Sequence, residues 1–121
     1  FATRAFPDAV RRVLERAGVA LSDIDLLISH QANINIIRTS MDVLGLCMEK
    51  TYTNIDRYGN TSGASVPIAL AEACQEGRLV DKDILVLVGF GGGLCWGSVA
   101  FRWYQNTGVL AVADRESSCC G

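Results

Sequence analysis

The chain has 121 residues, of which half are hydrophobic and a fifth are charged, and its formal net charge is −2. This composition predicts one globular domain with a buried core. It excludes a nucleic-acid surface built on a basic stripe, and no apolar run in the sequence approaches the roughly 20 residues that a membrane-spanning helix needs.

The first third of the chain predicts a helix, a strand and a second helix. Apolar residues at positions 6, 10, 13 and 17 lie on one helical face, and Gly18 provides a stop. The apolar stretch LLIS, residues 26–29, predicts a short buried strand. From Asn33 onward, apolar residues at 34, 37, 41 and 44 mark another helical face, which Gly45 ends.

The middle of the chain predicts a brief strand over Tyr52–Ile55, then a loop in RYGNTSG. A third helix should begin between Ser62 and Ser65, where a hydroxyl can cap it and Pro67 is tolerated in the first turn. This helix should end at Gly77. Its inward-facing residues are expected to be Val66, Leu70, Ala73 and Cys74.

Two strands complete the pattern. ILVLVGF, residues 84–90, predicts a fully buried strand, and SVAFRW, residues 98–103, alternates with Val99, Phe101 and Trp103 on one face. GFGGGLCWG between them is too rich in glycine to belong to either strand. The order of elements predicts an α/β fold closed by a hairpin, followed by an irregular tail over residues 104–121.

The five cysteines are an odd number without a repeated CxxC spacing. This pattern predicts reduced thiols in a cytoplasmic protein rather than a zinc site or a disulfide framework. We therefore expect no metal and no cofactor.

Three motifs fall at the ends of predicted elements, where open α/β sheets place their ligands: HQAN, YGNTSG and GFGGG. Each also has an ordinary structural explanation. A single histidine, His30, is more often a surface or core residue than a catalyst, and Asn60 after a glycine is a common turn residue. The glycine run lacks the Lys and Ser/Thr spacing of a phosphate-binding loop, which excludes that function.

Taken together, in order and with their flanking residues, the three motifs favour a functional site over these ordinary structural explanations. HQANINII, NIDRYGNTSGASVPIALAEA and GFGGGLCWGSVAFRW resemble the C-terminal half of β-ketoacyl-acyl-carrier-protein synthase III. This condensing enzyme of the thiolase-like superfamily initiates type II fatty-acid biosynthesis. The resemblance implies a thiolase-like domain over residues 1–103, with a mixed sheet covered by helices and closed by a C-terminal β-hairpin. Because Phe1 lies inside a helical pattern, we expect a missing N-terminal portion.

The resemblance implies a Cys-His-Asn triad in which His30 and Asn60 are the catalytic histidine and asparagine. Decarboxylation of a malonyl thioester builds negative charge on the thioester oxygen, and two N–H donors can form an oxyanion hole for that enolate. The family uses a backbone N–H of the GGG loop, here Gly92, to hold the oxyanion of acyl transfer. Asn33 resembles a position that lines the pantetheine tunnel.

The sequence departs from the family in two places that bear on activity. The nucleophilic cysteine belongs to the N-terminal half, so this chain alone should not condense acyl chains. Asn35 stands where relatives commonly carry an arginine that docks the carrier protein, and Arg38 one turn later could partly compensate. The implied partners are acyl-CoA, malonyl-acyl-carrier protein, the missing half or a second chain, and another copy in a homodimer.

Two alternatives to a condensing-enzyme fragment stay open at this point. The chain could be a non-catalytic half-domain that binds an acyl or pantetheine ligand or a partner subunit. It could also be an inert remnant of a truncated gene.

Overall fold

A computed structural model describes residues 2–91 and 95–105. The helices are α1 (Ala2–Ala17), α2 (Ile34–Leu44), α3 (Ile55–Tyr58) and α4 (Ser65–Gln75), and the strands are β1 (Leu26–Ser29), β2 (Ile84–Gly91) and β3 (Cys95–Arg102). Short 3₁₀ helices cover Leu21–Asp23, Met48–Lys50 and Ser62–Ala64. None of the helices in these residues is long and apolar enough to cross a membrane.

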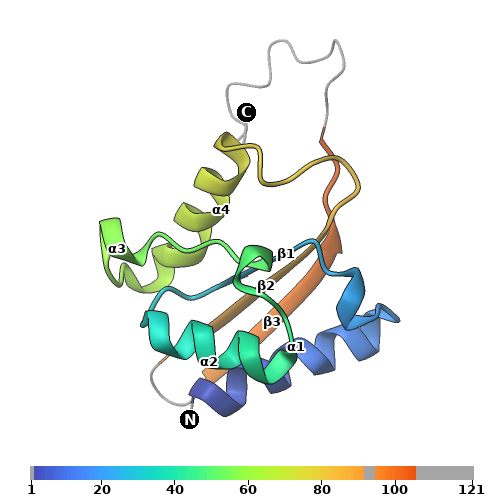
Figure 1. Ribbon diagram of the computed structural model, residues 1–121, viewed down its shortest axis with the longest axis horizontal. Coiled ribbons are helices and arrows are strands. Elements are labelled where there is room, and N and C mark those ends of the chain that lie inside the picture. The colour runs from blue at the N-terminus through green and yellow to red at the C-terminus, as the bar shows by residue number, and fades with distance from the viewer. Residues whose placement is uncertain (1, 92–94, 106–121) are drawn as a thin grey trace.

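The three strands form one mixed sheet in the order β1-β2-β3, with β1 parallel and β3 antiparallel to β2 (Figure 1). Helices α1 and α2 lie against one face, and α4 lies against the other (Figure 1). The predicted α/β class, with a mixed sheet covered by helices and closed by a hairpin, is therefore confirmed.

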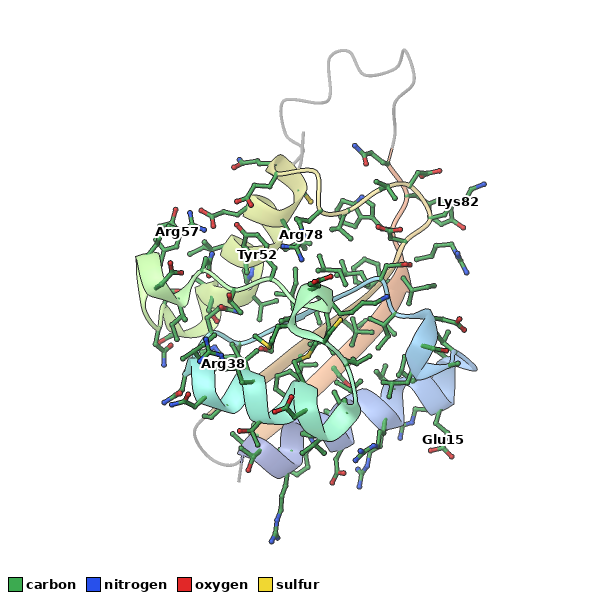
Figure 2. The ribbon with its side chains drawn as sticks, viewed as in Figure 1. Glu15, Arg38, Tyr52, Arg57, Arg78 and Lys82 are labelled. Atoms are coloured by element: carbon green, nitrogen blue, oxygen red, sulfur yellow. The ribbon has the colours of Figure 1, made fainter. Side chains whose placement is uncertain are left out.

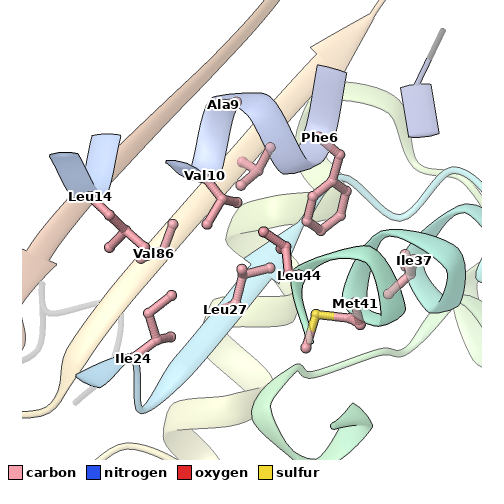
Figure 3. Close-up of a cluster of buried hydrophobic side chains, with 11 residues drawn as sticks. Phe6, Ala9, Val10, Leu14, Ile24, Leu27, Ile37, Met41, Leu44 and Val86 are labelled. Carbon is pink, nitrogen blue, oxygen red and sulfur yellow. The ribbon is translucent and has the colours of Figure 1, made fainter. Parts of the chain in front are cut away.

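A separate hydrophobic cluster packs against each face of the sheet. Phe6, Val10 and Leu14 of α1 meet the side chains of α2 and of the strands in the first cluster (Figure 3). The second cluster packs α4 against the opposite face, through Leu26, Ile28, Tyr52, Ala69, Ala73, Leu79 and Leu85. Leu26 and Ile28 of β1 enter the second cluster and Leu27 enters the first, so this strand is buried on both faces.

Two glycines end the first two long helices as predicted. Gly18 and Gly45 have φ of +69° and +73°, the left-handed conformation that a residue with a Cβ adopts only at a cost. The helix after the loop also begins where expected, at Ser65, with Pro67 in its first turn.

Two local predictions differ from the structure, one of them only in part. Tyr52–Ile55 is not a strand: only Thr51 pairs with Leu27, in an isolated bridge, and α3 begins at Ile55. Of the four residues predicted to face inward from α4, Ala73 is fully buried, and Val66, Leu70 and Cys74 are half-buried and pack against the edge of the same cluster. The centre of the inward face is formed by Ser65, Ala69 and Ala73. Small residues on that face let the helix lie close to the sheet.

The glycine-rich segment GFGGGLCWG also differs from its prediction, because both strands extend into it. Gly89 pairs with Gly97, and Gly91 pairs with Cys95, so the strands continue to the edge of the connection. Residues 92–94, including Gly92, lie outside the described residues, as do residues 106–121 of the expected tail.

Candidate active site

The carboxyl end of β1, the loop before α4 and the end of β2 meet at one cavity of about 530 Å³. This arrangement brings His30 and Asn60 to the same site, although 30 residues of sequence separate them. The lining residues are His30, Asn60, Ser62, Gly63, Ser65, Val66, Gly89, Phe90 and Gly91.

His30 is held at the end of β1 by its backbone and by its ring. Its N–H donates to the carbonyl of Val88 at 2.8 Å, which prolongs the pairing of β1 with β2. The ring lies edge-on to Phe90, with 5.2 Å between the centroids, and its Nδ1 is 2.6 Å from Ser65 Oγ. Burial lowers the pKa of His30 below its usual 6.5, against a hydrogen bond to the backbone of Ser62 that raises it. The imidazole is therefore neutral at pH 7.

Ser65 connects two neighbours through one hydroxyl. The backbone N–H of Gln31 donates to Ser65 Oγ at 3.2 Å, and the same oxygen contacts His30 Nδ1. We predicted that a hydroxyl caps this helix, but its N-cap residue is Ala64, and no side-chain capping bond forms. The serine hydroxyl is directed to the histidine instead.

Gln31, the second residue of HQAN, is buried and forms several hydrogen bonds. This structural role was not predicted from the sequence. Its side-chain Nε2 donates to the carbonyl of Ser29 at 2.8 Å, and its Oε1 accepts from the backbone N–H of Asn54 at 3.2 Å. These bonds join the end of β1 to the segment before α3. A polar residue two positions after a buried strand was the available signal, because a buried amide needs several partners.

Asn60 is oriented by a turn of its own. Its Oδ1 accepts a hydrogen bond from the backbone N–H of Ser62 at 2.9 Å. Because a backbone N–H can only donate, this contact assigns the amide oxygen to the turn and leaves the amide NH₂ to donate elsewhere. Ser62 has φ of +55°, an unfavourable conformation for a residue with a Cβ. From the sequence, Ser62 was expected only as a possible helix cap.

Asn33 and Arg38 are not part of this cavity lining. Asn33 is the N-cap of α2, where its Oδ1 accepts from the backbone N–H of Asn35 at 2.8 Å. Arg38 is exposed on the same helix (Figure 2). Gly92 lies outside the described residues.

None of the cysteines in the described part of the chain, Cys47, Cys74 and Cys95, lines the cavity. Within the same residues, no group of three or more His, Cys, Asp or Glu side chains is arranged to hold a metal ion.

The sequence matches the family model of the 3-oxoacyl-[acyl-carrier-protein] synthase III C terminal over residues 14–103. Beta-ketoacyl-[acyl-carrier-protein] synthase III of Symbiobacterium thermophilum is 53% identical over 103 residues, which are 85% of this chain and 31% of that protein. The Deinococcus radiodurans protein named synthase III 2 is 51% identical, over 88% of this chain and 31% of its own length.

Solved structures of synthase III proteins have the same arrangement of strands and helices. The Pseudomonas aeruginosa structure superposes with a TM-score of 0.84 at 46% identity, covering 88% of this chain and 34% of that one. The Thermus thermophilus structure gives 0.83 at 45% identity, covering 85% and 32%. The chain thus spans about a third of the length of these relatives. It belongs to the 3-oxoacyl-[acyl-carrier-protein] synthase III family, and the part of the family that it matches is the C-terminal one.

Proposed function

We propose that this chain supplies the enolate-stabilising part of a 3-oxoacyl-acyl-carrier-protein synthase III that acts in cytoplasmic fatty-acid biosynthesis. The observation that carries the proposal is the meeting of a neutral histidine and an oriented asparagine amide at one cavity. The substrates would be an acyl-CoA and malonyl-acyl-carrier protein, and the assembly would be a homodimer that includes the N-terminal half. Asn33 would contact the pantetheine arm.

The proposed chemistry begins with the malonyl thioester. Its carboxylate leaves as CO₂, and the electron pair of the broken C–C bond moves onto the thioester oxygen. His30 Nε2–H and the amide NH₂ of Asn60 would donate to that oxygen. In the complete enzyme the enolate carbon then attacks the acyl-cysteine, a C–C bond forms and the thiolate departs. The backbone N–H of Gly92 would stabilise the oxyanion of this second step.

The contact with Ser65 is compatible with the tautomer of His30 that the enolate requires. Ser65 Oγ accepts from Gln31, so its own proton is available to His30 Nδ1. A neutral ring that accepts at Nδ1 carries its proton on Nε2, which is the donor that the enolate requires.

Decarboxylation of malonyl-CoA tests the proposal, with release of acetyl-CoA measured for the chain alone and for the chain mixed with the N-terminal half of a relative. Both samples should decarboxylate, and only the mixture should condense. His30→Ala and Asn60→Ala should each lower the decarboxylation rate roughly 100- to 1000-fold. A rate that neither substitution changes would contradict the proposal, and binding of the thioester without turnover would favour the non-catalytic half-domain.

A further inference from the structure

Glu72 lies in the middle of α4 and accepts hydrogen bonds from three residues of the segment that precedes Asn60. Its side chain is only 15% exposed. The donors are Asn54 Nδ2 at 3.1 Å, Arg57 at 3.1 and 2.6 Å, and Tyr58 Oη at 2.7 Å. Tyr52 Oη also lies 3.1 Å from Glu72, but its single proton is closer to Glu76, at 2.5 Å. One carboxylate therefore binds the segment that leads into Gly59 and Asn60.

The bonds from Arg57 and Tyr58 give this contact its geometry. Arg57 donates one guanidinium nitrogen to each carboxylate oxygen, a planar paired arrangement that fixes orientation as well as distance. Its guanidinium also lies over the ring of Tyr58, 5.4 Å from the centroid. Figure 2 shows Arg57 and Tyr52 together between α3 and α4. Tyr58 is only two residues before Asn60, so the position of Tyr58 constrains the position of Asn60.

Glu72 stays ionised and Tyr52 stays protonated near neutral pH. The hydrogen bond from Tyr58, with those from Arg57 and Asn54, lowers the pKa of Glu72 to about 2. Burial and a hydrogen bond with Glu76 raise the pKa of Tyr52 to about 12. The carboxylate thus stays an acceptor and the phenol stays a donor.

The position of Glu72 on α4 relates it to the histidine. Ser65, which contacts His30, and Glu72 are seven residues apart, close to two helical turns, and so lie on the same side of the helix. One rigid helix therefore holds the ring of His30 near its start and the segment of Asn60 near its middle.

We propose that Glu72 is a positioning residue that sets the amide of Asn60 relative to His30. The proposal rests on the proposed role of Asn60 as an enolate donor. Without the carboxylate, α3 loses its attachment to α4, and the Asn60 turn moves relative to the histidine. A misplacement of about 1 Å can cost on the order of 100-fold in rate, so Glu72→Gln should lower the rate constant of decarboxylation roughly 10- to 100-fold.

A double-mutant cycle in malonyl-CoA decarboxylation separates positioning from general stabilisation. If Glu72 acts through Asn60, Glu72→Gln should have little further effect, less than about twofold, in the Asn60→Ala background. Glu15→Gln, which removes the same charge from an exposed position on α1, should leave the rate unchanged in both backgrounds. An equal loss with and without Asn60 would overturn the proposal.

A second measurement does not depend on activity. The ¹⁵N relaxation of the Asn60 side-chain amide reports its order, which should fall in Glu72→Gln while the backbone amide of His30, bonded to Val88, keeps its order. If the chain does not decarboxylate but this change is seen, the proposed function fails and the positioning role of Glu72 stands. An unchanged Asn60 amide overturns the positioning role. Should Glu72→Gln not fold, Tyr58→Phe removes one donor and must show the same loss of order in milder form.

Discussion

Replacing Ser65 by alanine removes a single oxygen that serves two buried neighbours. Ser65 is 1% exposed, and its Oγ lies 2.6 Å from His30 Nδ1 and 3.2 Å from the backbone nitrogen of Gln31. Gln31 is equally buried, so the substitution leaves its N–H without its acceptor. The substitution should therefore affect both stability and the state of the histidine.

The expected loss of stability follows from the backbone N–H of Gln31, which loses its acceptor. A buried group left without its partner costs about 1–3 kcal/mol, so Ser65→Ala should lower the free energy of unfolding by that amount. Ser40 offers a matched control, because its side-chain oxygen is also buried but has no hydrogen-bond partner among the described residues. Ser40→Ala should leave the stability unchanged or raise it slightly. Urea unfolding of the two variants measures the difference.

The histidine gives a second, spectroscopic readout. His30 is the only histidine of the chain, so its ring nitrogens can be assigned without ambiguity by ¹⁵N NMR. The wild-type chain should show the proton on Nε2, and Ser65→Ala should increase the Nδ1–H form, because the donor to Nδ1 is gone. A wild-type ring protonated on Nδ1, or equal destabilisation by the Ser65 and Ser40 substitutions, would refute this reasoning.

Two further predictions concern the strained turn and the pH dependence of folding. Ser62→Gly should not destabilise the chain, since glycine adopts a φ of +55° freely, whereas Ser62→Val should cost about 1–3 kcal/mol in urea unfolding and lower the order of the Asn60 amide. The lowered pKa of His30 means that the unfolded chain binds its proton more readily, so this residue's contribution to stability is complete above pH 6.5 and is lost as the pH falls below it. His30→Gln should flatten the stability curve in that range, and an unchanged curve would count against a buried neutral ring.

The sequence predicted the elements whose signals are local. The period of apolar residues in α1 and α2 and the glycines after them depend on neighbours within one or two turns, and both helices end where expected. The apolar stretch of β1 was equally clear because both faces of this strand are buried. His30 and Asn60 were found through their motifs, and the fold brings them to one cavity.

The parts that could not be predicted depend on partners distant in sequence. Tyr52 has the aromatic character of a strand residue, yet its hydroxyl lies within hydrogen-bond distance of Glu72 and Glu76, and the chain turns into α3 three residues later. Ser65 was expected to cap a helix, because nothing local indicates that a histidine 35 residues earlier takes its hydroxyl. A polar side chain can satisfy several partners, and only the tertiary structure selects among them.

The proposed enolate site is separable from the rest of the condensing chemistry. His30 depends on β1, β2 and Ser65, and the segment of Asn60 depends on Glu72, so both donors are positioned by contacts within this third of the synthase length. Acyl transfer also needs a nucleophilic thiol, and no described cysteine lines the cavity. Decarboxylation and condensation should therefore dissociate: mixing this chain with an N-terminal half should add condensation to an activity already present, rather than create both together.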